Sequence, residues 1–574
     1  MIEQIKDPKD RFKNDKLTQK LREIPLFFFE ENKEPAKMSS RATVLSGLAE
    51  YTGSWDELTT SHLLKRCLFG VKKSEIDYFK TLSMSEAVDQ LISSSPSPAP
   101  PVNDYAPAYA DIEDPDVLFG ETWINAPHNN DIEGYRILSL KSWILNNILE
   151  QEPSLHQKMT LFWHNLLVTQ FWDLNIAKAS YKYYKMLFDH AFGNYKSLIK
   201  QLTIDPAMLF FLNGTYNNKE APDENYAREL QELFCIGKGP DSNYTESDVQ
   251  QAAKVLTGWV VDWQNTILVE GEPDSFFYAP YHDTSDKQFS SFYENKIIEG
   301  KSGVEGASET DELIDMIFDN SETALYICRR LYNFFVYHEI DEETESNIII
   351  PLAQILRDAN FQIEPVLRTL FKSEHFYDAA SRGAQIKNPM DHLLGLWRTM
   401  EVPRSEDLYA KLVINNSLLW SISEVGMELG DPPSVSGWQA YYQDPTYDRF
   451  WINTDTIIKR TIRQDSLIYW GHWVSENLQI NADLIGFVST FDNPGDPVLL
   501  IEEMSLLLLG IPLSTDAIDG MTTILNGDFG NGYWASIWYD FIYDSENEEK
   551  RVTVENRLKA MLSPFMQLSE FQLM

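Results

Sequence analysis

Apolar residues recur at helical spacing along most of the chain, and no other feature of the sequence restricts its fold as strongly. Residues three and four positions apart form apolar stripes, and stretches of Gly, Pro, Ser and Asp separate one stripe from the next. No fixed repeat period relates the stripes to one another. The pattern predicts a mainly α, large helical fold with long loops, with helices over 61–69, 74–79, 85–92, 134–150, 154–170, 181–191, 195–202, 206–212, 311–337, 348–359, 363–371 and 389–400.

Two segments depart from this helical pattern. Residues 93–116 are rich in Pro, Ser and Ala, a composition that cannot hold a helix. Residues 258–299 show short alternation around Trp259, Val261 and Trp263, which is typical of a small β-hairpin or an extended lid. We therefore expect a charged N-terminal extension over 1–55 and a helical body over 56–574. The body is either a single unit or two lobes joined through the loop-rich segment 258–300.

Acidic residues dominate the charge, because 87 Asp and Glu face 48 Lys and Arg and give a formal net charge of −39. Such a surface repels phosphate backbones and anionic lipids, so nucleic acid is not an expected partner. No apolar run reaches the ~18 residues of a membrane span, so no direct membrane insertion is expected. The charged N-terminus has no apolar signal core. On its own sequence the chain is expected to stay in the cytoplasm.

The segment PDENYARELQELFCIGKG (222–239) combines a complete apolar stripe with a charged face. A helix that begins after Asp223 and ends at Gly237 places its apolar side chains on one side. The opposite side carries a polar cluster of Glu224, Asn225, Arg228, Glu229 and Glu232. Carboxylates paired with an arginine stay ionised and donate protons poorly. We therefore prefer a structural clamp to an acid/base site as the role of this cluster.

The next segment, NYTESDVQQAAKVLTGW (243–259), has a capping box of Thr245 and Asp248 ahead of another apolar stripe. Together the two segments resemble the central signature of the bacterial family known as "domain of unknown function 1800". The resemblance covers roughly residues 58–574. Further motifs agree with the family in their order along the chain: HLLKRCLFG, MTLFWHN, HDTSDK, SETALYICRRLYNFF, ILRDANFQIEPVLRTLFKSEHF, IKNPMDHL, PPSVSGW and SEFQL.

This resemblance implies a helical fold, assigns no reaction and names no cofactor. Members of the family look as if they are often exported, and are commonly found beside a second family with an alkaline-phosphatase-like fold that carries the export signal. The resemblance therefore implies a protein partner of that fold. It also implies a periplasmic, cell-surface or secreted location that this chain reaches through its partner.

A histidine beside a carboxylate, His282-Asp283, follows the alternating segment and forms a second candidate site. Such a histidine can serve as a base or as a metal ligand. A metal needs three or four ligands, and no local spacing supplies them, so the preferred role is a turn that braces the loop. The catalytic hypothesis combines Glu229, Glu232, His282 and Asp283 as a carboxylate-based site. It requires that the charged face of 223–237 meets the loop of His282 in one shared interior site.

The loop DPPSVSGWQAYYQDPTYDRFW (431–451) is dense in aromatic residues. Trp438, Tyr441, Tyr442 and Trp451 are candidates for a stacking platform that binds sugars or a partner loop. The alternative is that these side chains anchor a long loop to the helices, and this alternative is preferred. His164 lies among apolar residues of a predicted helix and is expected to be a core residue.

Three functions follow from these patterns. The first is a non-enzymatic interaction or scaffold component of an envelope-associated or secreted assembly. The second is a polysaccharide-directed hydrolase that uses a carboxylate pair from the polar cluster, and the third is a metal-binding protein. The sequence contains no nucleophile elbow, phosphate loop, dinucleotide fingerprint or zinc-protease motif. Whether the chain is an enzyme stays open at this point.

Overall fold

Helices dominate the computed structural model, which describes residues 47–93, 95–239, 241–475 and 478–574. Within these ranges 57% of the chain is helical, in 24 helices, and the strands form only small two-stranded antiparallel sheets. The predicted mainly α fold is confirmed. Contacts group Leu45–Met574 into one unit, and residues 1–46 of the predicted extension lie outside the described residues.

Two of the early helices, α2 and α4, begin at side-chain caps that the sequence supplies. Asp56 accepts a hydrogen bond from the Thr59 amide at the start of α2, and Ser83 and Glu86 form a capping box at α4. The Pro-rich segment lies in a loop without helices between α4 and α5, as predicted. The bounds are α2 (Glu57–Cys67), α3 (Lys73–Phe79), α4 (Met84–Leu91), α5 (Glu133–Leu149), α6 (His156–Leu166), α7 (Phe171–Leu174), α8 (Ala177–Asp189), α9 (Tyr195–Thr203) and α10 (Pro206–Phe211).

The central helices follow the predicted pattern with two differences. Thr245 and Asp248 form the expected capping box of α12. The stretch predicted as one helix over 311–337 is two helices, because the side chain of Asn320 caps a new helix by accepting from the Glu322 amide. The helix predicted up to Gly237 continues after Glu229 as a π-helix, η4 (Leu230–Cys235). The bounds are α11 (Asn225–Glu229), α12 (Glu246–Val255), α13 (Ser308–Asp319), α14 (Ser321–Phe335), α15 (Glu342–Thr344), α16 (Ile350–Asp358) and α17 (Ile363–Lys372).

Short strands confirm the hairpin region predicted at 258–299. β1 (Trp259–Val261) pairs with β2 (Ser275–Phe277), and Trp259 lies opposite Phe277. β3 (Lys287–Gln288) pairs with β4 (Ile297–Ile298). A third hairpin, β5 (His472–Ser475) with β6 (Leu478–Ile480), contacts α19 (Leu408–Glu424) through β5 and was not predicted.

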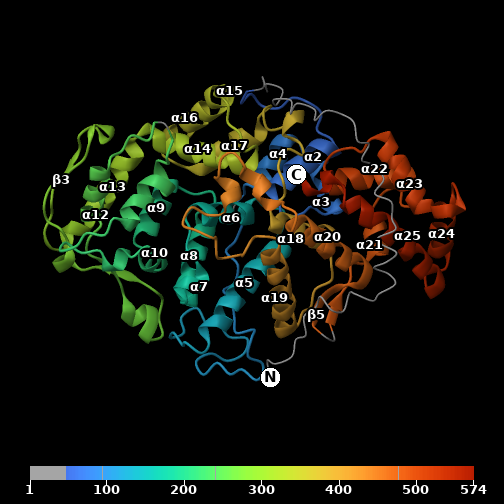
Figure 1. Cartoon of the computed structure of the whole chain (residues 1–574), viewed down its shortest axis with the longest axis horizontal. Coiled ribbons are helices and arrows are strands. Elements are labelled where there is room, and N and C mark those ends of the chain that lie inside the picture. Colours follow the sequence, from blue (N-terminus) through green and yellow to red (C-terminus); the bar gives the residue numbers. More distant parts are fainter. Residues whose placement is uncertain (1–46, 94, 240, 476–477) are drawn as a thin grey trace. The chain divides into compact units, whose positions relative to one another are not determined.

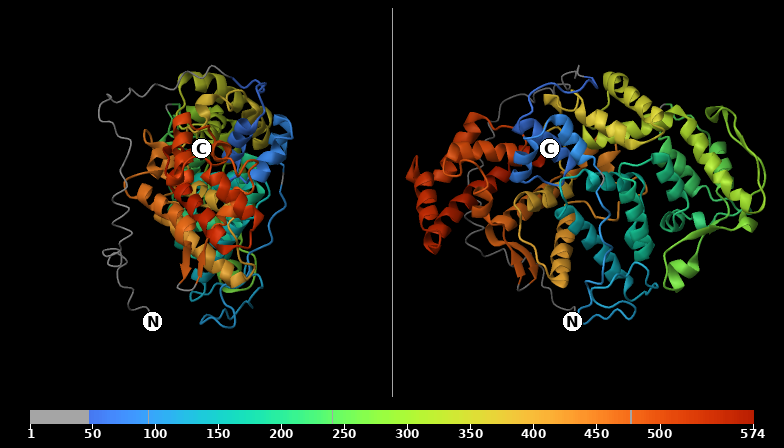
Figure 2. Two further views of the ribbon diagram at one scale, coloured as in Figure 1. Left: turned by 90° about the vertical axis from the view of Figure 1, so that its right-hand side faces the viewer. Right: turned by 180° about the vertical axis from the view of Figure 1, so that it is seen from behind.

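In its described residues the last third of the chain adds eight helices, of which α22 to α25 pack mainly on one another. Figure 1 shows α22 to α25 in red at one end of the drawn helices, and α12, α13 and β3 in green at the other. Seen from behind in Figure 2, α5 and α19 remain adjacent, in agreement with their contacts. The bounds are α18 (Pro389–Thr399), α19 (Leu408–Glu424), α20 (Thr456–Asp465), α21 (Leu484–Val488), α22 (Pro497–Leu508), α23 (Thr515–Asn526), α24 (Tyr533–Tyr543) and α25 (Glu548–Met566).

Gly70, the last residue of the motif HLLKRCLFG, lets the chain after α2 approach α18 closely. Its φ is +81°, and a Cβ atom there would lie 2.3 Å from the carbonyl oxygen of Gly395 in α18. Both the backbone conformation and the available space therefore require glycine at this position. The close approach explains why a glycine terminates this motif.

Gly70→Ala should lower the free energy of unfolding by about 3 kcal/mol or more, because a left-handed residue costs ~1–2 kcal/mol and the overlap with α18 adds to it. Gly120→Ala is the matched control, since Gly120 has a φ of +87° and open space around it. That variant should lose only the ~1 kcal/mol of backbone strain. Urea unfolding followed by circular dichroism measures both. Equal losses would contradict the packing account.

Candidate functional site

The charged face of 222–239 lies at the protein surface, where Arg228 ties two helices together. Its guanidinium pairs with Glu224 at 3.1 Å and with Glu246, the first residue of α12, at 2.6 Å. All three side chains are about one third exposed or more. Exposed pairs of this kind contribute little to stability. The arrangement is a surface clamp between α11 and α12.

The other members of the polar cluster have separate partners. Glu232 pairs with Lys238 beyond the end of η4, and the Asn225 amide donates to the Leu212 carbonyl oxygen at 3.3 Å. Glu229 is half-buried; burial, and then the charge of Glu232, raise the pKa of its carboxyl. Its Oε2 atom has no hydrogen-bond partner within the described residues. The surroundings of Glu229 thus favour the protonated form of its carboxyl.

His282 is buried and its ring is held on both sides. Nδ1 lies 2.8 Å from the Thr257 carbonyl oxygen, and Nε2 lies 3.0 Å from Oε1 of Glu309. Both ring nitrogens therefore lie within hydrogen-bond distance of a protein oxygen atom. Glu309 also accepts from the Lys287 ammonium at 2.5 Å and from the Lys301 amide at 2.6 Å. A single buried carboxylate thus receives three donors.

Glu309 stays ionised in this network. Burial alone would raise the pKa of its carboxyl, but hydrogen bonds from His282 and Lys287 outweigh burial and leave the pKa below its ordinary value of 4.5. Sequence reasoning identified His282 but missed Glu309. The two residues are 27 positions apart, and only the fold brings the start of α13 against the loop.

Asp283 and Asp286 hold the loop in place. Asp283 accepts from the Ser285 amide at 2.8 Å and from its hydroxyl at 2.5 Å, and Asp286 accepts from the Gly300 amide at 2.9 Å. The hydrogen bonds from Ser285 outweigh burial and lower the pKa of Asp283. This geometry is that of a braced turn.

The expected meeting of the charged face with the His282 loop is not found. Among the described hydrogen bonds and ion pairs, Arg228 contacts Glu224 and Glu246, whereas His282 contacts Thr257 and Glu309. The reason is that α12 supplies a glutamate at its first turn, so the arginine turns toward the surface instead of the loop. The structure therefore does not form the single interior site that the catalytic hypothesis requires.

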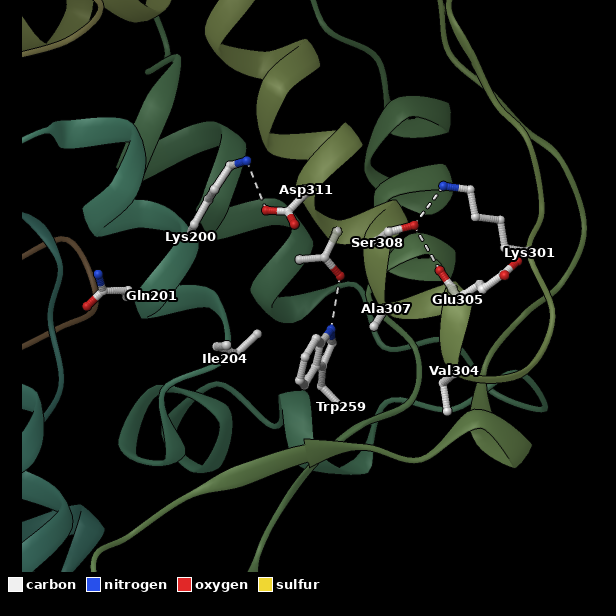
Figure 3. A pocket seen from close by; sticks show the side chains of 11 residues that line it. Lys200, Gln201, Ile204, Trp259, Lys301, Val304, Glu305, Ala307, Ser308 and Asp311 are labelled. Atoms are coloured by element: carbon white, nitrogen blue, oxygen red, sulfur yellow. Dashed lines mark hydrogen bonds and ion pairs between the residues drawn. The ribbon is translucent and has the colours of Figure 1, made fainter.

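A hollow of about 570 Å³ lies beside the Glu309 network (Figure 3). Trp259 and Ile204 form an apolar floor with Ala307, and polar side chains surround it. The indole N–H of Trp259 donates to Oγ1 of Thr310 at 2.9 Å. Thr310 is the neighbour of Glu309, so the buried network fixes one wall of the hollow.

The aromatic loop 431–451 has its tryptophans turned inward. Trp438 and Trp451 are buried, and the ring of Tyr441 stacks on Phe334 with centroids 5.0 Å apart. The Asn388 amide donates to the Tyr441 hydroxyl at 3.0 Å. Tyr442 is partly exposed. These contacts are those of anchors that pin the loop, and they leave Trp438, Tyr441 and Trp451 without a free stacking face.

Two further motif residues also serve packing. The side-chain oxygen of Asn165 accepts from the Trp438 amide at 3.0 Å, and Gly437 leaves room for the Asn165 carbonyl, which a Cβ would approach to 2.3 Å. His164 is buried beside Tyr183, with Nδ1 3.2 Å from its hydroxyl. Burial lowers the pKa of His164 to about 3, so the ring is neutral. It is a core histidine.

A buried polar network lies where several of the sequence motifs converge, and sequence reasoning missed it. Lys158 of α6 pairs with Asp391 of α18, and Asn388 donates to the second oxygen of Asp391 at 2.6 Å. Arg66 of α2 donates to Gln385 and, at 2.7 Å, to the Ser381 carbonyl oxygen. The available signal was a lone charged residue on an otherwise apolar helical stripe, as for Asp391 in IKNPMDHLLGLW.

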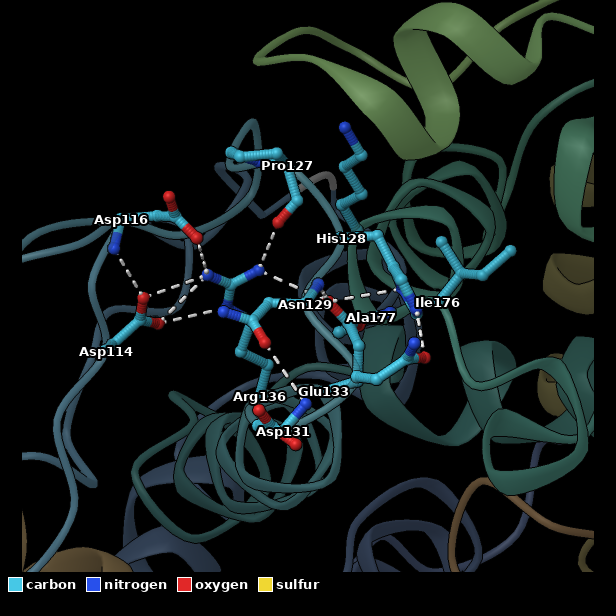
Figure 4. Close-up of polar contacts among 12 residues, drawn as sticks. Asp114, Asp116, Pro127, His128, Asn129, Asp131, Glu133, Arg136, Ile176 and Ala177 are labelled. Carbon is cyan, nitrogen blue, oxygen red and sulfur yellow. Dashed lines mark hydrogen bonds and ion pairs between the residues drawn. The ribbon is translucent and has the colours of Figure 1, made fainter.

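A second buried ionic cluster holds the Pro-rich loop (Figure 4). Arg136 of α5 makes hydrogen bonds of 3.0–3.1 Å to the Asp114 carboxylate and one of 2.7 Å to the Pro127 carbonyl oxygen. Glu133 accepts from Arg136 at 3.2 Å and from the Ala177 amide at 2.7 Å. Within its described residues the loop has no helix or strand to order its backbone, and the hydrogen bonds from Arg136 hold it in place instead.

Within the part of the chain that the structure describes, no group of three or more His, Cys, Asp or Glu residues is placed to hold a metal ion. In the same ranges, no helix combines the length and the apolar content needed to cross a bilayer.

The structure defines the class of protein, and comparison with known proteins then gives its family. The chain is a helical protein whose motif residues hold helices and loops together, and residues 62–572 match the family described as "Protein of unknown function (DUF1800)". The chain belongs to this family. Comparisons with curated proteins and with solved structures gave no match.

Glu309→Gln should lower the free energy of unfolding by about 3 kcal/mol or more at pH 7, because Lys287 is left buried without its counter-charge. The pKa of Glu309 is lowered in the folded state. Its contribution is therefore complete above about pH 4.5 and is lost as the pH falls through the folded value. The difference between wild type and variant should shrink below pH 4.

Chemical unfolding at pH 7 and at pH 3.5 measures this difference. Glu246→Gln is the matched control, since it removes the exposed partner of Arg228 and should leave stability unchanged at both pH values. A loss for Glu309→Gln that is independent of pH would contradict the assignment of an ionised carboxylate.

Proposed function

We propose that the protein is a non-enzymatic binding component of a larger assembly, and that α24 is the helix that contacts its partner. The observation that supports this proposal is that α24 is apolar on both sides. An amphipathic surface helix normally buries one apolar face and exposes a polar one.

The inner side of α24 is accounted for by its own neighbours. Trp534, Trp538 and Phe541 are buried against α23 and α25, and the rings of the two tryptophans lie 5.4 Å apart. The indole N–H of Trp534 donates to the Pro494 carbonyl oxygen at 2.9 Å. These contacts hold the helix firmly, so its outer side is presented on a fixed scaffold.

The outer side of α24 carries a second apolar stripe. Tyr539, Ile542 and Tyr543 occupy positions i, i+3 and i+4 and are 63%, 52% and 91% exposed. Residues at this spacing share one helix face. A stripe of large apolar side chains on a rigid surface marks an interaction site, and tyrosine is enriched among the residues that dominate binding energy.

The charges around the stripe indicate the chemistry of the partner. Residues 526–549 contain six acids and neither Lys nor Arg. Lys550 pairs with Asp540 and Asp544 at 2.9 and 3.4 Å, and none of the described ion pairs involves Asp528, Glu546, Glu548 or Glu549. A complementary partner segment is an amphipathic helix whose apolar face is flanked by Lys or Arg.

The family resemblance implies the protein that would carry this segment. It is a protein with an alkaline-phosphatase-like fold and an export signal, and binding to it takes this chain to the periplasm, the cell surface or the medium. The hydrolase alternative has less support, because Glu229 and Glu232 lie in a different network from His282 and Asp283.

The double variant Ile542→Asp/Tyr543→Asp should lose partner binding and keep its fold, because both side chains are exposed. The defined probe is a fluorescent Leu/Lys amphipathic peptide, and its affinity should fall at least ~30-fold, the equivalent of ~2 kcal/mol. A Leu/Glu peptide of the same pattern should not bind. In the native host, tagged wild-type protein should co-purify with an alkaline-phosphatase-like protein identified by mass spectrometry, and the double variant should not.

Leu118→Asp is the matched control, since Leu118 is an exposed apolar residue on a distant part of the chain and is 78% exposed. It should bind like wild type. The proposal is wrong if the double variant retains both the peptide and the partner. It is also wrong if wild type is a dimer and the double variant is a monomer, because the stripe then forms an interface between two copies of this chain.

A further inference from the structure

We propose that the hollow of Figure 3 binds a neutral carbohydrate, with the indole ring of Trp259 as its stacking surface. The site lies between α9, β1 and the start of α13. It shares no residue with α24, so this inference is independent of the proposed protein-docking function. A pocket of this volume with an apolar floor and a few polar groups is the usual form of a small-ligand site.

The floor of the hollow offers a fixed aromatic surface. Trp259 is held by its hydrogen bond to Thr310 and by the ring of Phe277, which packs against it at 5.4 Å with an interplanar angle of 68°. Ile204 and Ala307 extend the apolar floor on either side (Figure 3). Pyranose rings present C–H faces that pack on aromatic rings, and tryptophan gives the largest such surface.

The rim of the hollow favours a ligand without charge. Lys200 is neutralised by Asp311 at 2.9 Å and Asp315 at 3.0 Å, and Lys301 pairs with Glu312 and donates to the Ser308 hydroxyl at 2.7 Å. Among the residues that line the hollow, Lys200 and Lys301 are balanced by Glu305 and Asp311, so the lining carries no net formal charge and a charged ligand gains little net attraction. The same groups retain lone pairs and N–H donors for hydroxyl groups.

Gln201 adds a side-chain amide that is unpaired within the described part of the chain. Gln201 lies at the edge of the hollow, where Figure 3 shows its amide pointing away from Trp259, and the side chain is exposed and makes none of the described hydrogen bonds. An amide supplies both a donor and an acceptor, which is the pair that vicinal hydroxyls of a sugar require.

The buried Glu309 network prepares this site in advance. Glu309 lies between Ser308 and Thr310 of the hollow and is fixed by His282, Lys287 and the Lys301 amide. The wall that carries Thr310, and through it Trp259, is therefore ordered without a ligand. Preorganisation of this kind lowers the entropy cost of binding.

A second hollow, of about 500 Å³ around Trp172, is the competing location. There the Lys141 ammonium lies 4.9 Å from the indole centroid, and the indole N–H donates to Glu428 at 3.0 Å. Lys141 also pairs with Asp431 at 2.6 Å. A cation occupies part of this aromatic surface and acids use its hydrogen bonds, so the hollow at Trp259 is the better carbohydrate site.

Five neutral oligosaccharides test the proposal with the full-length protein: cellohexaose, xylohexaose, laminarihexaose, maltohexaose and N-acetylchitohexaose. Binding is measured by isothermal titration calorimetry and by saturation-transfer NMR, neither of which depends on tryptophan fluorescence. At least one probe should bind wild type. Trp259→Ala should weaken its affinity by tenfold or more and Gln201→Ala by a smaller factor, whereas Trp172→Ala should leave it unchanged.

Ala307→Phe gives a second route that does not remove the tryptophan. The introduced ring fills the hollow from the turn just before α13, and this variant should abolish binding while its thermal unfolding stays near that of wild type. The proposal is overturned if none of the five probes binds. It is also overturned if binding survives both Trp259→Ala and Ala307→Phe, or is lost in Trp172→Ala instead.

Discussion

The buried ion pair between Lys158 and Asp391 is the contact on which the arrangement of the other helices depends. It joins α6 to α18, and both side chains are almost completely excluded from water. Burial raises the pKa of the Asp391 carboxyl, and the Lys158 ammonium opposes that shift. Because an unpaired charge at this depth is strongly destabilising, the two helices are fixed in a position that keeps both partners together. Asn388 then caps α18 and holds the second carboxylate oxygen.

Several motifs that carry the family resemblance converge on this pair. Arg66 of HLLKRCLFG reaches Gln385 and Ser381 near the start of α18, and Gly70 of the same motif meets Gly395 in α18. Tyr441, just after PPSVSGW, receives a hydrogen bond from Asn388. These motif residues therefore act in packing and in satisfying buried polar groups. The motifs that identify the family therefore lie mostly in the interior of the protein. They do not by themselves show which part of the surface binds a ligand or a partner.

Most helices could be predicted from the sequence, but the contacts between residues far apart in the sequence could not. Local signals, such as the Thr245–Asp248 capping box, specify where a helix begins because all the atoms involved lie within one turn. The π-helical turn after Glu229 was not predictable, since its wider i→i+5 hydrogen bonding extends over too few residues to change the apolar pattern of the sequence. Asn320 was likewise overlooked as a break, although Asn is a common N-cap and its side chain does cap α14.

The same limit applies to the candidate site. His282 was recognisable as a histidine beside a carboxylate, but the carboxylate that holds it is Glu309 and not the neighbouring Asp283. The catalytic hypothesis required the helix face of Arg228 to meet the His282 loop, and Arg228 instead pairs with Glu246 of the neighbouring helix. All five members of the cluster are partly exposed. The packing of the helices decides which carboxylate pairs with an arginine or a histidine. A local sequence pattern does not contain this information.

The distribution of charge on the surface differs between the two proposed binding sites. With a net charge of −39 the protein repels most acidic partners, so a specific partner must offer either positive charge or no charge. α24 suits the first kind, since its apolar stripe lies in a segment with acids and no bases. The hollow at Trp259 suits the second, since its lysines are already neutralised by Asp311, Asp315 and Glu312. One acidic surface thus suits two different ligands. Four acids beside α24 (Asp528, Glu546, Glu548 and Glu549) are in none of the described ion pairs, whereas the lysines around Trp259 are already paired with acids.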